Sequence, residues 1–241
     1  KHNPIECAEQ YAEVIENLYS QSMSGEHSLI REIAKFEAHI PNEGECINIS
    51  RTIALSIFKK NTLKQLFLDI SELVQRDVKT GIQRVVRSIL KECLHNPPEG
   101  YRVEPVYATV EQGYRYARQY TKNFLGLSNI ESLDDEPIDY APGDIFFVLD
   151  LQPQVQVANR AFLQELRRYG VRVIFMVHDL LCVRMPQHFL PGAYDNMVAW
   201  LQVVAESDAA VSISEATAMD LMRWTQENSV FRQRAFKIAW F

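Results

Sequence analysis

Short apolar runs of strand length alternate with amphipathic stretches of helical spacing from Leu66 to the end of the chain. Strands are expected at residues 66–70, 102–107, 145–149, 171–177, 209–213 and 236–240. Helices are expected at residues 81–94, 155–169, 193–206 and 215–227. This regular alternation predicts right-handed βαβ units, and therefore an α/β domain whose mostly parallel sheet carries helices on both faces.

The first quarter of the chain has a different pattern. Apolar residues in 1–62 recur at helical spacing, glutamates occupy the other face, and no strand pattern is present. We interpret 1–62 as a helical linker or the tail of a preceding module, and 63–241 as the α/β domain. Within that domain, 111–127 is interpreted as a further helix and 128–142 as an acidic loop.

Composition narrows the classes of function. The formal charge of the 241 residues is −6, which gives no general attraction for nucleic acid. The four cysteines, Cys7, Cys46, Cys93 and Cys182, are widely spaced, which argues against a zinc site or disulfide framework and favours a reducing cytoplasm. Lys1 leads into a glutamate-rich helix and not into a signal peptide. The apolar runs are too short to span a bilayer, while a peripheral membrane contact stays open.

Polar residues follow the expected strands at their carboxyl ends, which is where open α/β sheets bind ligands. The candidates are Ser71 after the first strand, Asp150 after the third, His178 and Asp179 after the fourth, and Ser214 and Glu215 after the fifth. An imidazole at such a position can donate to or accept from a sugar hydroxyl, and a neighbouring acid can orient it. The alternative is that these residues are helix caps and turn formers, which every strand–helix loop needs.

The triplet Lys79-Thr80-Gly81 precedes the strongest expected helix. Glycine permits close backbone approach, and a helix N-terminus offers free N–H groups to a phosphate or sugar hydroxyl. A plain helix cap explains the triplet equally well. Neither GxGxxG nor GxxxxGK[ST] occurs, so neither a dinucleotide site nor a P-loop is expected.

An aromatic and basic segment, GYRYARQYT at 113–121, permits two interpretations. Tyrosine faces stack on sugar rings, and arginines bind phosphates through two hydrogen bonds. The alternative, which we favour, is an exposed helix stabilised by contacts between residues four apart.

Three segments together resemble the retaining glycosyltransferases of family 4. LFLDISELVQRDVKTGIQRVVRSIL (66–90) resembles the first strand, loop and helix of that family. VIFMVHDLLCVRMPQHF (173–189) resembles its "HDL…P" segment, and ESDAAVSISEATAMDL (206–221) resembles a later strand and helix. The three occur in the family's order, cover about three quarters of the chain, and are most similar to mannosyltransferases of bacterial surface-polysaccharide assembly.

The resemblance implies the acceptor-side, Rossmann-like half of a GT-B fold. It places Gly81, Ile82 and Arg84 at the helix start near the acceptor, and His178 beside the transferred sugar with Asp179 next to it. It also implies transfer, with retention, from a nucleotide diphosphate sugar such as GDP-mannose to a hydroxyl of a glycan or lipid-linked acceptor. No bound metal or other cofactor is expected, and the implied location is the cytoplasm, at the inner face of the membrane.

The chain departs from the family in one respect. The family's second domain, which carries an E-x(7)-E motif and most of the nucleotide-sugar contacts, has no counterpart in these 241 residues. We therefore expect a fragment, inactive by itself, of a longer enzyme that supplies the missing C-terminal domain. Our hypothesis is that this parent is a tandem enzyme.

Two rival functions remain at this stage. The first is a non-catalytic interaction domain that scaffolds a polysaccharide-biosynthesis complex, with 1–62 as its docking helices. The second is a Rossmann-like hydrolase or epimerase, which needs a nucleophile or a glycine-rich nucleotide loop that the sequence does not display.

Overall fold

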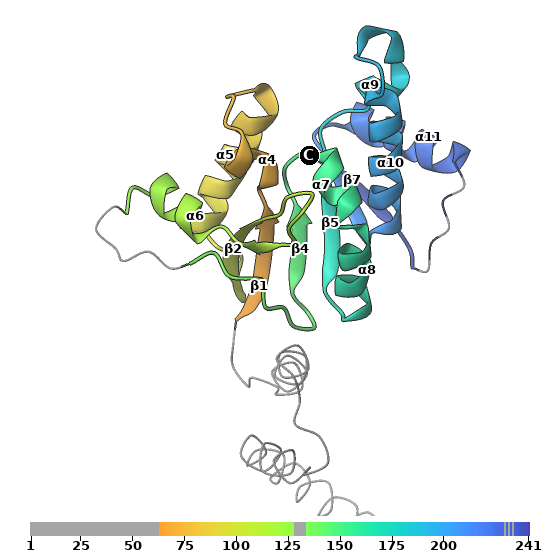
Figure 1. Cartoon of the computed structure of the whole chain (residues 1–241). Helices are drawn as coiled ribbons and strands as arrows, with labels where there is room; N and C mark the ends of the chain where they lie inside the picture. The colour runs from red at the N-terminus through yellow and green to blue at the C-terminus, as the bar shows by residue number, and fades with distance from the viewer. Residues whose placement is uncertain (1–62, 128–133, 229, 231, 233) are drawn as a thin grey trace, which may run out of the picture. The chain divides into compact units, whose positions relative to one another are not determined.

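The computed structural model describes residues 63–127, 134–228, 230, 232 and 234–241. The helical segment expected at 1–62 lies outside the described residues, and so does the domain boundary expected after it. One seven-stranded sheet, with strand order β3-β2-β1-β4-β5-β6-β7, organises the described part (Figure 1). Its strands are β1 (Lys64–Asp69), β2 (Tyr101–Tyr107), β3 (Arg115–Tyr116), β4 (Ile145–Val148), β5 (Arg172–Val177), β6 (Ala209–Ser212) and β7 (Lys237–Trp240).

Neighbouring strands run parallel throughout the sheet except β2 and β3, which are antiparallel. The helices are α4 (Ser71–Gln75), α5 (Gly81–His95), α6 (Arg118–Phe124), α7 (Pro153–Ala158), α8 (Arg160–Arg168), α9 (Leu181–Arg184), α10 (Ala193–Glu206) and α11 (Glu215–Glu227), with a 3-10 turn η1 at Pro186–His188. The expected mostly parallel α/β architecture is therefore confirmed.

Helices pack on both faces of the sheet and form two apolar cores. On one face, Val86 and Leu90 of α5 pack with Leu68 of β1 in a core that also receives α6. On the other face, Leu166 of α8 and Trp200 of α10 join the buried residues of β4, β5 and β6. The alternation of side chains along each strand divides the apolar residues between these two cores.

The segment 111–127 differs from the single helix predicted for it. Its first part is a loop and the short strand β3, and α6 begins only at Arg118. Tyr114 and Tyr116 are buried, so they form neither an exposed helix face nor a stacking surface for sugars. The prediction was wrong because these two tyrosines, which are two residues apart, both point into the core, as in a strand. The Arg118 guanidinium lies over the Tyr116 ring, 4.6 Å from its centroid.

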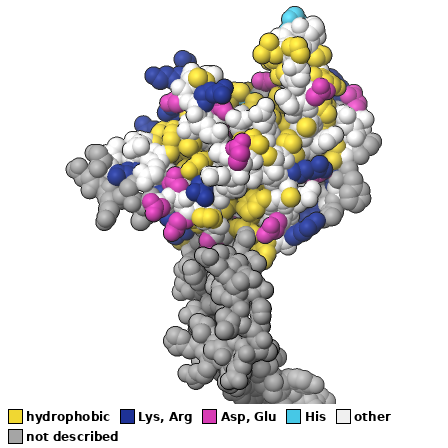
Figure 2. Space-filling view, viewed as in Figure 1, with side chains coloured by type: hydrophobic (Ala, Val, Ile, Leu, Met, Phe, Trp, Pro, Cys, Tyr) yellow, Lys and Arg dark blue, Asp and Glu magenta, His cyan; other side chains and the backbone are white. Residues whose placement is uncertain are grey.

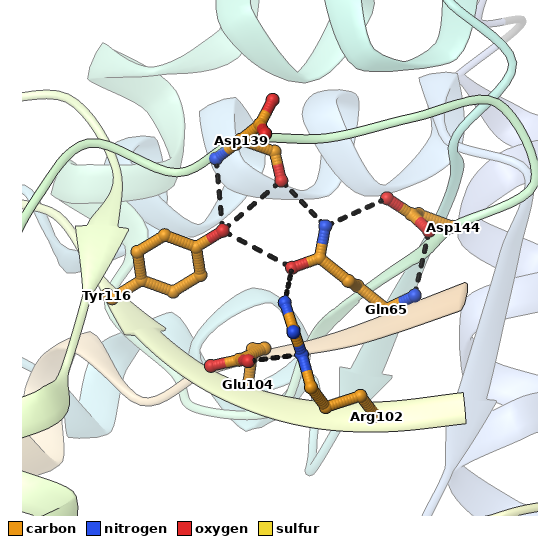
Figure 3. Close-up of polar contacts among 6 residues, drawn as sticks. All are labelled: Gln65, Arg102, Glu104, Tyr116, Asp139 and Asp144. Carbon is orange, nitrogen blue, oxygen red and sulfur yellow. Dashed lines mark hydrogen bonds and ion pairs between the residues drawn. The ribbon is translucent and has the colours of Figure 1, made fainter. Parts of the chain in front are cut away.

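Tyr116 belongs to a polar network at the amino edge of the sheet (Figure 3). Its hydroxyl lies 3.2 Å from Oε1 of Gln65, whose Nε2 donates to the carbonyl of Asp139 at 2.7 Å. Asp144 accepts from the Gln65 backbone N–H at 2.7 Å, and Arg102 donates to Gln65 Oε1 at 2.9 Å. This network fixes the starts of β1, β2 and β4 at the edge opposite the predicted site.

Two further boundaries differ from the sequence prediction. The helix expected at 155–169 is divided at Asn159 into α7 and α8. The Asn159 side chain donates to the carbonyls of Val155 at 2.9 Å and Thr109 at 3.3 Å, and such local bonds compete with a continuous helix. The short helices α4 and α9 were not predicted, because four or five residues are too few to show a helical period.

Candidate functional site

The sheet has a topological switch point between β1 and β4. These strands are neighbours, but the chain leaves β1 for α5 on one face and leaves β4 for α7 and α8 on the other. The loops after such a pair of strands diverge, and open α/β sheets bind ligands outside the carboxyl ends at this place. The loops after β1, β4, β5 and β6 meet at this same edge because the four strands are parallel.

A fully buried carboxylate, Asp69, organises the end of β1. It accepts from the backbone N–H of Ser71 at 3.0 Å and from the Ser71 hydroxyl. It also accepts from the Tyr114 hydroxyl at 2.8 Å and from Gln156 Nε2 at 3.1 Å. Burial raises the pKa of Asp69, while these hydrogen bonds oppose that rise. The predicted site residue Ser71 is thus buried, and its hydroxyl also accepts from the Ala108 N–H at 3.0 Å.

Asp150, predicted at the end of the next strand, links β4 to α4. It is only 1% exposed, and its carboxylate accepts from the N–H of Leu73 at 2.7 Å and from that of Leu151 at 2.9 Å. Its own N–H donates to the Asp69 carbonyl at 3.1 Å. Burial raises the pKa of Asp150 to about 7, and the neighbouring charges of Asp69 and Glu72 add to the rise. The buried side chains of Ser71 and Asp150 therefore stabilise the loops that follow β1 and β4.

His178 follows β5 and is 3% exposed. Its Nε2 lies 3.2 Å from the carbonyl oxygen of Leu149. A carbonyl only accepts, so Nε2 carries the proton in this contact and Nδ1 is the acceptor nitrogen of a neutral ring. Burial lowers the pKa of His178, which favours this neutral form. Within the described residues no hydrogen bond occupies Nδ1.

Asp179, next to His178 in the chain, is half-buried. Its Oδ1 accepts from the N–H of Leu181 at 3.0 Å, which shapes the start of α9. Among the described contacts none joins its carboxylate to the His178 ring by a hydrogen bond.

The predicted helix start at Gly81 is present and is capped. The Thr80 hydroxyl accepts from the N–H of Gln83 at 3.2 Å, and the Gln83 side chain accepts from the N–H of Thr80 at 3.3 Å. This capping box leaves the N–H groups of Gly81 and Ile82 without a partner in the described part of the chain. Arg84 is exposed and has no ion pair there, while Ile82 packs against the α5 core.

The residues after β6 also fit a capping role. Ser214 is the N-cap of α11, with its hydroxyl accepting from the N–H of Thr217 at 3.2 Å, and Glu215 is exposed in the first turn. Ser212, two residues earlier, is fully buried, and its hydroxyl has no hydrogen-bond partner among the described residues.

Hydrogen bonds connect part of the predicted set. A continuous path runs from Ser71 through Asp69 to Asp150, and His178 joins the same edge through Leu149. No described hydrogen bond connects Gly81, Arg84, Ser214 or Glu215 to this path.

Sequence reasoning missed Tyr114 and Gln156 as partners of Asp69, because they lie 45 and 87 residues away from it. The described residues contain no group of three His, Cys, Asp or Glu side chains arranged to hold a metal ion.

The fold and its polar edge define a Rossmann-like α/β domain whose candidate ligand site lies at the switch point. No family model matches the chain. The chain is similar to three proteins of Escherichia coli, each named serotype-specific mannosyltransferase WbdA. The identities are 36% over 189 residues, 36% over 190 and 35% over 189, which is 78% of this chain in each case. The matches cover 22–23% of the relatives, so the chain spans less than a quarter of their length.

Proposed function

We propose that this chain is the acceptor-side half of a retaining, family 4 glycosyltransferase with a GT-B fold. In this proposal it takes part in transferring mannose from GDP-mannose to a hydroxyl of a glycan or lipid-linked acceptor, at the cytoplasmic face of the membrane, during surface-polysaccharide assembly. The observation that carries the proposal is the similarity to mannosyltransferases over 78% of the chain. A separate domain of the same fold would bind most of the nucleotide.

His178 receives the central role in this proposal. Its free acceptor, Nδ1, belongs to a ring that the Leu149 carbonyl orients, and a sugar hydroxyl is a suitable donor to it. The ring stays neutral because burial lowers its pKa, so it accepts a hydrogen bond at neutral pH. Asp179 then positions the loop that follows.

The start of α5 receives the second role. The unpaired N–H groups of Gly81 and Ile82, the positive end of the helix dipole and the exposed Arg84 favour a negatively charged group. Developing negative charge on the leaving diphosphate is the group that a glycosyl transfer needs to stabilise. Ser214 and Glu215, at the start of α11, complete the proposed substrate contacts from β6.

The test is mannosyl transfer from GDP-mannose to a mannose-terminated acceptor by the full-length enzyme. His178→Ala is expected to lower the transfer rate by about 10- to 100-fold, the effect of losing one positioned hydrogen bond to a reacting sugar. His178→Gln, which retains an N–H for the Leu149 carbonyl, separates loss of sugar contact from loss of folding. The control is His95→Ala, at an exposed histidine in the last turn of α5. A folded His178→Ala enzyme with wild-type activity contradicts the proposal.

A further inference from the structure

Asp69 places a carboxylate in the interior of the domain, where it is 0% exposed. In the described part of the chain no helix is long and apolar enough to cross a bilayer, and Figure 2 shows acidic and basic side chains interspersed with hydrophobic ones on the outside. The hydrogen bonds that Asp69 accepts come from the neutral groups of Ser71, Tyr114 and Gln156, and no ion pair of the described residues includes it. A buried carboxylate without a cation destabilises a fold, so stability alone does not explain an aspartate here.

The peptide group between Leu149 and Asp150 connects Asp69 to His178. Its N–H, on Asp150, donates to the Asp69 carbonyl at 3.1 Å. Its carbonyl, on Leu149, lies 3.2 Å from Nε2 of His178. A trans peptide group is planar, so its N–H and its C=O point in opposite directions and turn together. The hydrogen bond to Asp69 therefore fixes the direction of the carbonyl that His178 contacts.

Gln156, a fully buried residue of α7, holds the remainder of the same loop. Its Nε2 donates to Oδ2 of Asp69 at 3.1 Å and to the Asp150 carbonyl at 3.4 Å. Its Oε1 accepts from the N–H of Gln152 at 3.2 Å. Three successive peptide groups, from residue 149 to residue 152, are thus hydrogen-bonded either to Asp69 or to Gln156.

Helix capping accounts for only part of this arrangement. Gln152 is the N-cap of α7, so the bond from its N–H to Gln156 is one that a capped helix uses. Capping does not account for Nε2 of Gln156, which leaves the helix to bind a carboxylate 87 residues away, at the end of β1. A buried side chain that binds both a strand end and the neighbouring loop holds the two in one fixed arrangement.

We propose that Asp69 and Gln156 are positioning residues for His178. Through the 149–150 peptide group they keep Nε2 as the nitrogen of the ring that carries the proton and Nδ1 as its acceptor. Both side chains are fully buried, so they act through the imidazole and do not contact the sugar themselves. That the oriented ring accepts a hydrogen bond from the transferred sugar rests on the proposed function; the orientation of the ring does not.

The first measurement is NMR of the labelled ring nitrogens of the 241-residue chain, with His178→Gln to assign the signals of His178. The wild-type ring should be protonated at Nε2 and unprotonated at Nδ1. Gln156→Met has a similar volume but neither donor nor acceptor. In this variant we expect averaged signals from a mixture of the two neutral tautomers, because the Leu149 carbonyl is no longer held against Nε2.

Gln156→Glu is a variant that pH can switch. While protonated, the introduced carboxyl has both a donor and an acceptor, as glutamine does, and the carboxyl groups of Asp69 and Asp150 beside it favour this form. Once ionised, it has no donor and repels Asp69. In the full-length enzyme its turnover number relative to that of the wild type should fall about tenfold or more between about pH 6 and pH 8, while KM for GDP-mannose changes less than about twofold. The ring-nitrogen signals of the chain should change over the same pH range.

The matched control is Gln75→Glu, at an exposed glutamine whose amide also donates to a distant carbonyl, that of Ala108 at 2.8 Å. This control should leave the His178 ring and the pH profile unchanged. Circular dichroism at each pH shows whether a variant is folded. If Gln156→Met does not fold, the ring nitrogens of Gln156→Glu decide, and the protonation of the wild-type ring needs no variant.

Four results overturn the proposal. They are a wild-type His178 ring protonated at Nδ1, wild-type ring signals in a folded Gln156 variant, an equal disturbance of the ring by Gln75→Glu, and a folded, active Gln156→Glu enzyme whose pH profile parallels that of the wild type. If the ring responds to the Gln156 variants as expected but the wild-type enzyme transfers no mannose, the proposed function fails and the positioning of His178 stands.

Discussion

The fold does not require a glycine at position 81. The backbone angles of Gly81 are available to any residue, and a Cβ atom built on it meets nothing within 4 Å. It also occupies the first position of a helix, where alanine is favoured over glycine in propensity. Folding alone therefore gives no reason for a glycine here, whereas close approach of a ligand to the backbone does.

Gly81→Ala is accordingly expected to separate function from stability. The variant should keep or slightly raise the free energy of unfolding, by up to about 1 kcal/mol, because alanine restricts the unfolded chain. Its transfer activity in the full-length enzyme should fall. Gly113→Ala is the control, since Gly113 also has open space and no positive φ but lies in a loop outside the proposed contacts. Unchanged activity in Gly81→Ala removes this glycine from the site.

Asp150 makes the stability of the domain depend on pH. Its pKa is raised from 3.8 to about 7 in the folded protein. Between about pH 4 and 7 the folded state therefore holds a proton that the unfolded state releases. The stabilising contribution of the protonated group is complete below about pH 4 and is lost as the pH rises to about 7.

Asp150→Asn is expected to remove this contribution. The free energy of unfolding of the wild type should fall, relative to that of the variant, by up to about 1.4 kcal/mol per pH unit across the window. Urea unfolding at several pH values, with Glu99→Gln as an exposed-carboxylate control, measures the difference. Parallel pH profiles for wild type and Asp150→Asn contradict the assignment.

At the scale of elements, local pattern was sufficient where a helix is long and packs by one face. The predicted bounds of α10 and α11 agree with the structure, since Trp200 and Val204, or Leu221 and Trp224, recur at helical spacing and are buried. The local sequence pattern failed to predict a helix boundary where a tertiary contact decides the conformation. Asn159 ends α7 through its own bonds, one of them to the distant Thr109, and no periodicity reports such a bond.

The candidate site was predictable to the same degree. Parallel strands place Ser71, Asp150, His178 and Ser214 at one edge, and this follows from strand order alone. What the sequence could not supply was which of them is open to a ligand. Ser71 and Asp150 are both buried: Ser71 begins α4, and Asp150 accepts from the N–H of Leu73 in that helix, which is too short for the sequence pattern to reveal.

At the scale of the whole molecule, we expect the described part of the chain to fold by itself. Thr62–Phe241 forms one compact unit, with an apolar core on each face of the sheet. β1 joins β2 and β3 to the rest of the sheet, because it pairs with β2 on one side and β4 on the other. Its Phe67 and Leu68 point into opposite cores, so this strand also contributes to both.

A chain of residues 62–241 is therefore expected to unfold in one cooperative transition, monitored by circular dichroism during heating or in urea. A chain of residues 71–241 lacks β1 and is the matched control. It should show no such transition, since β2 and β4 lose their common partner and both cores lose fully buried side chains, each costing about 2–5 kcal/mol. If residues 62–241 fail to give a cooperative transition, the domain requires residues 1–61 and the boundary assigned at residue 62 is wrong. If the chain without β1 still unfolds cooperatively, the sheet does not depend on the strand that joins β2 to β4.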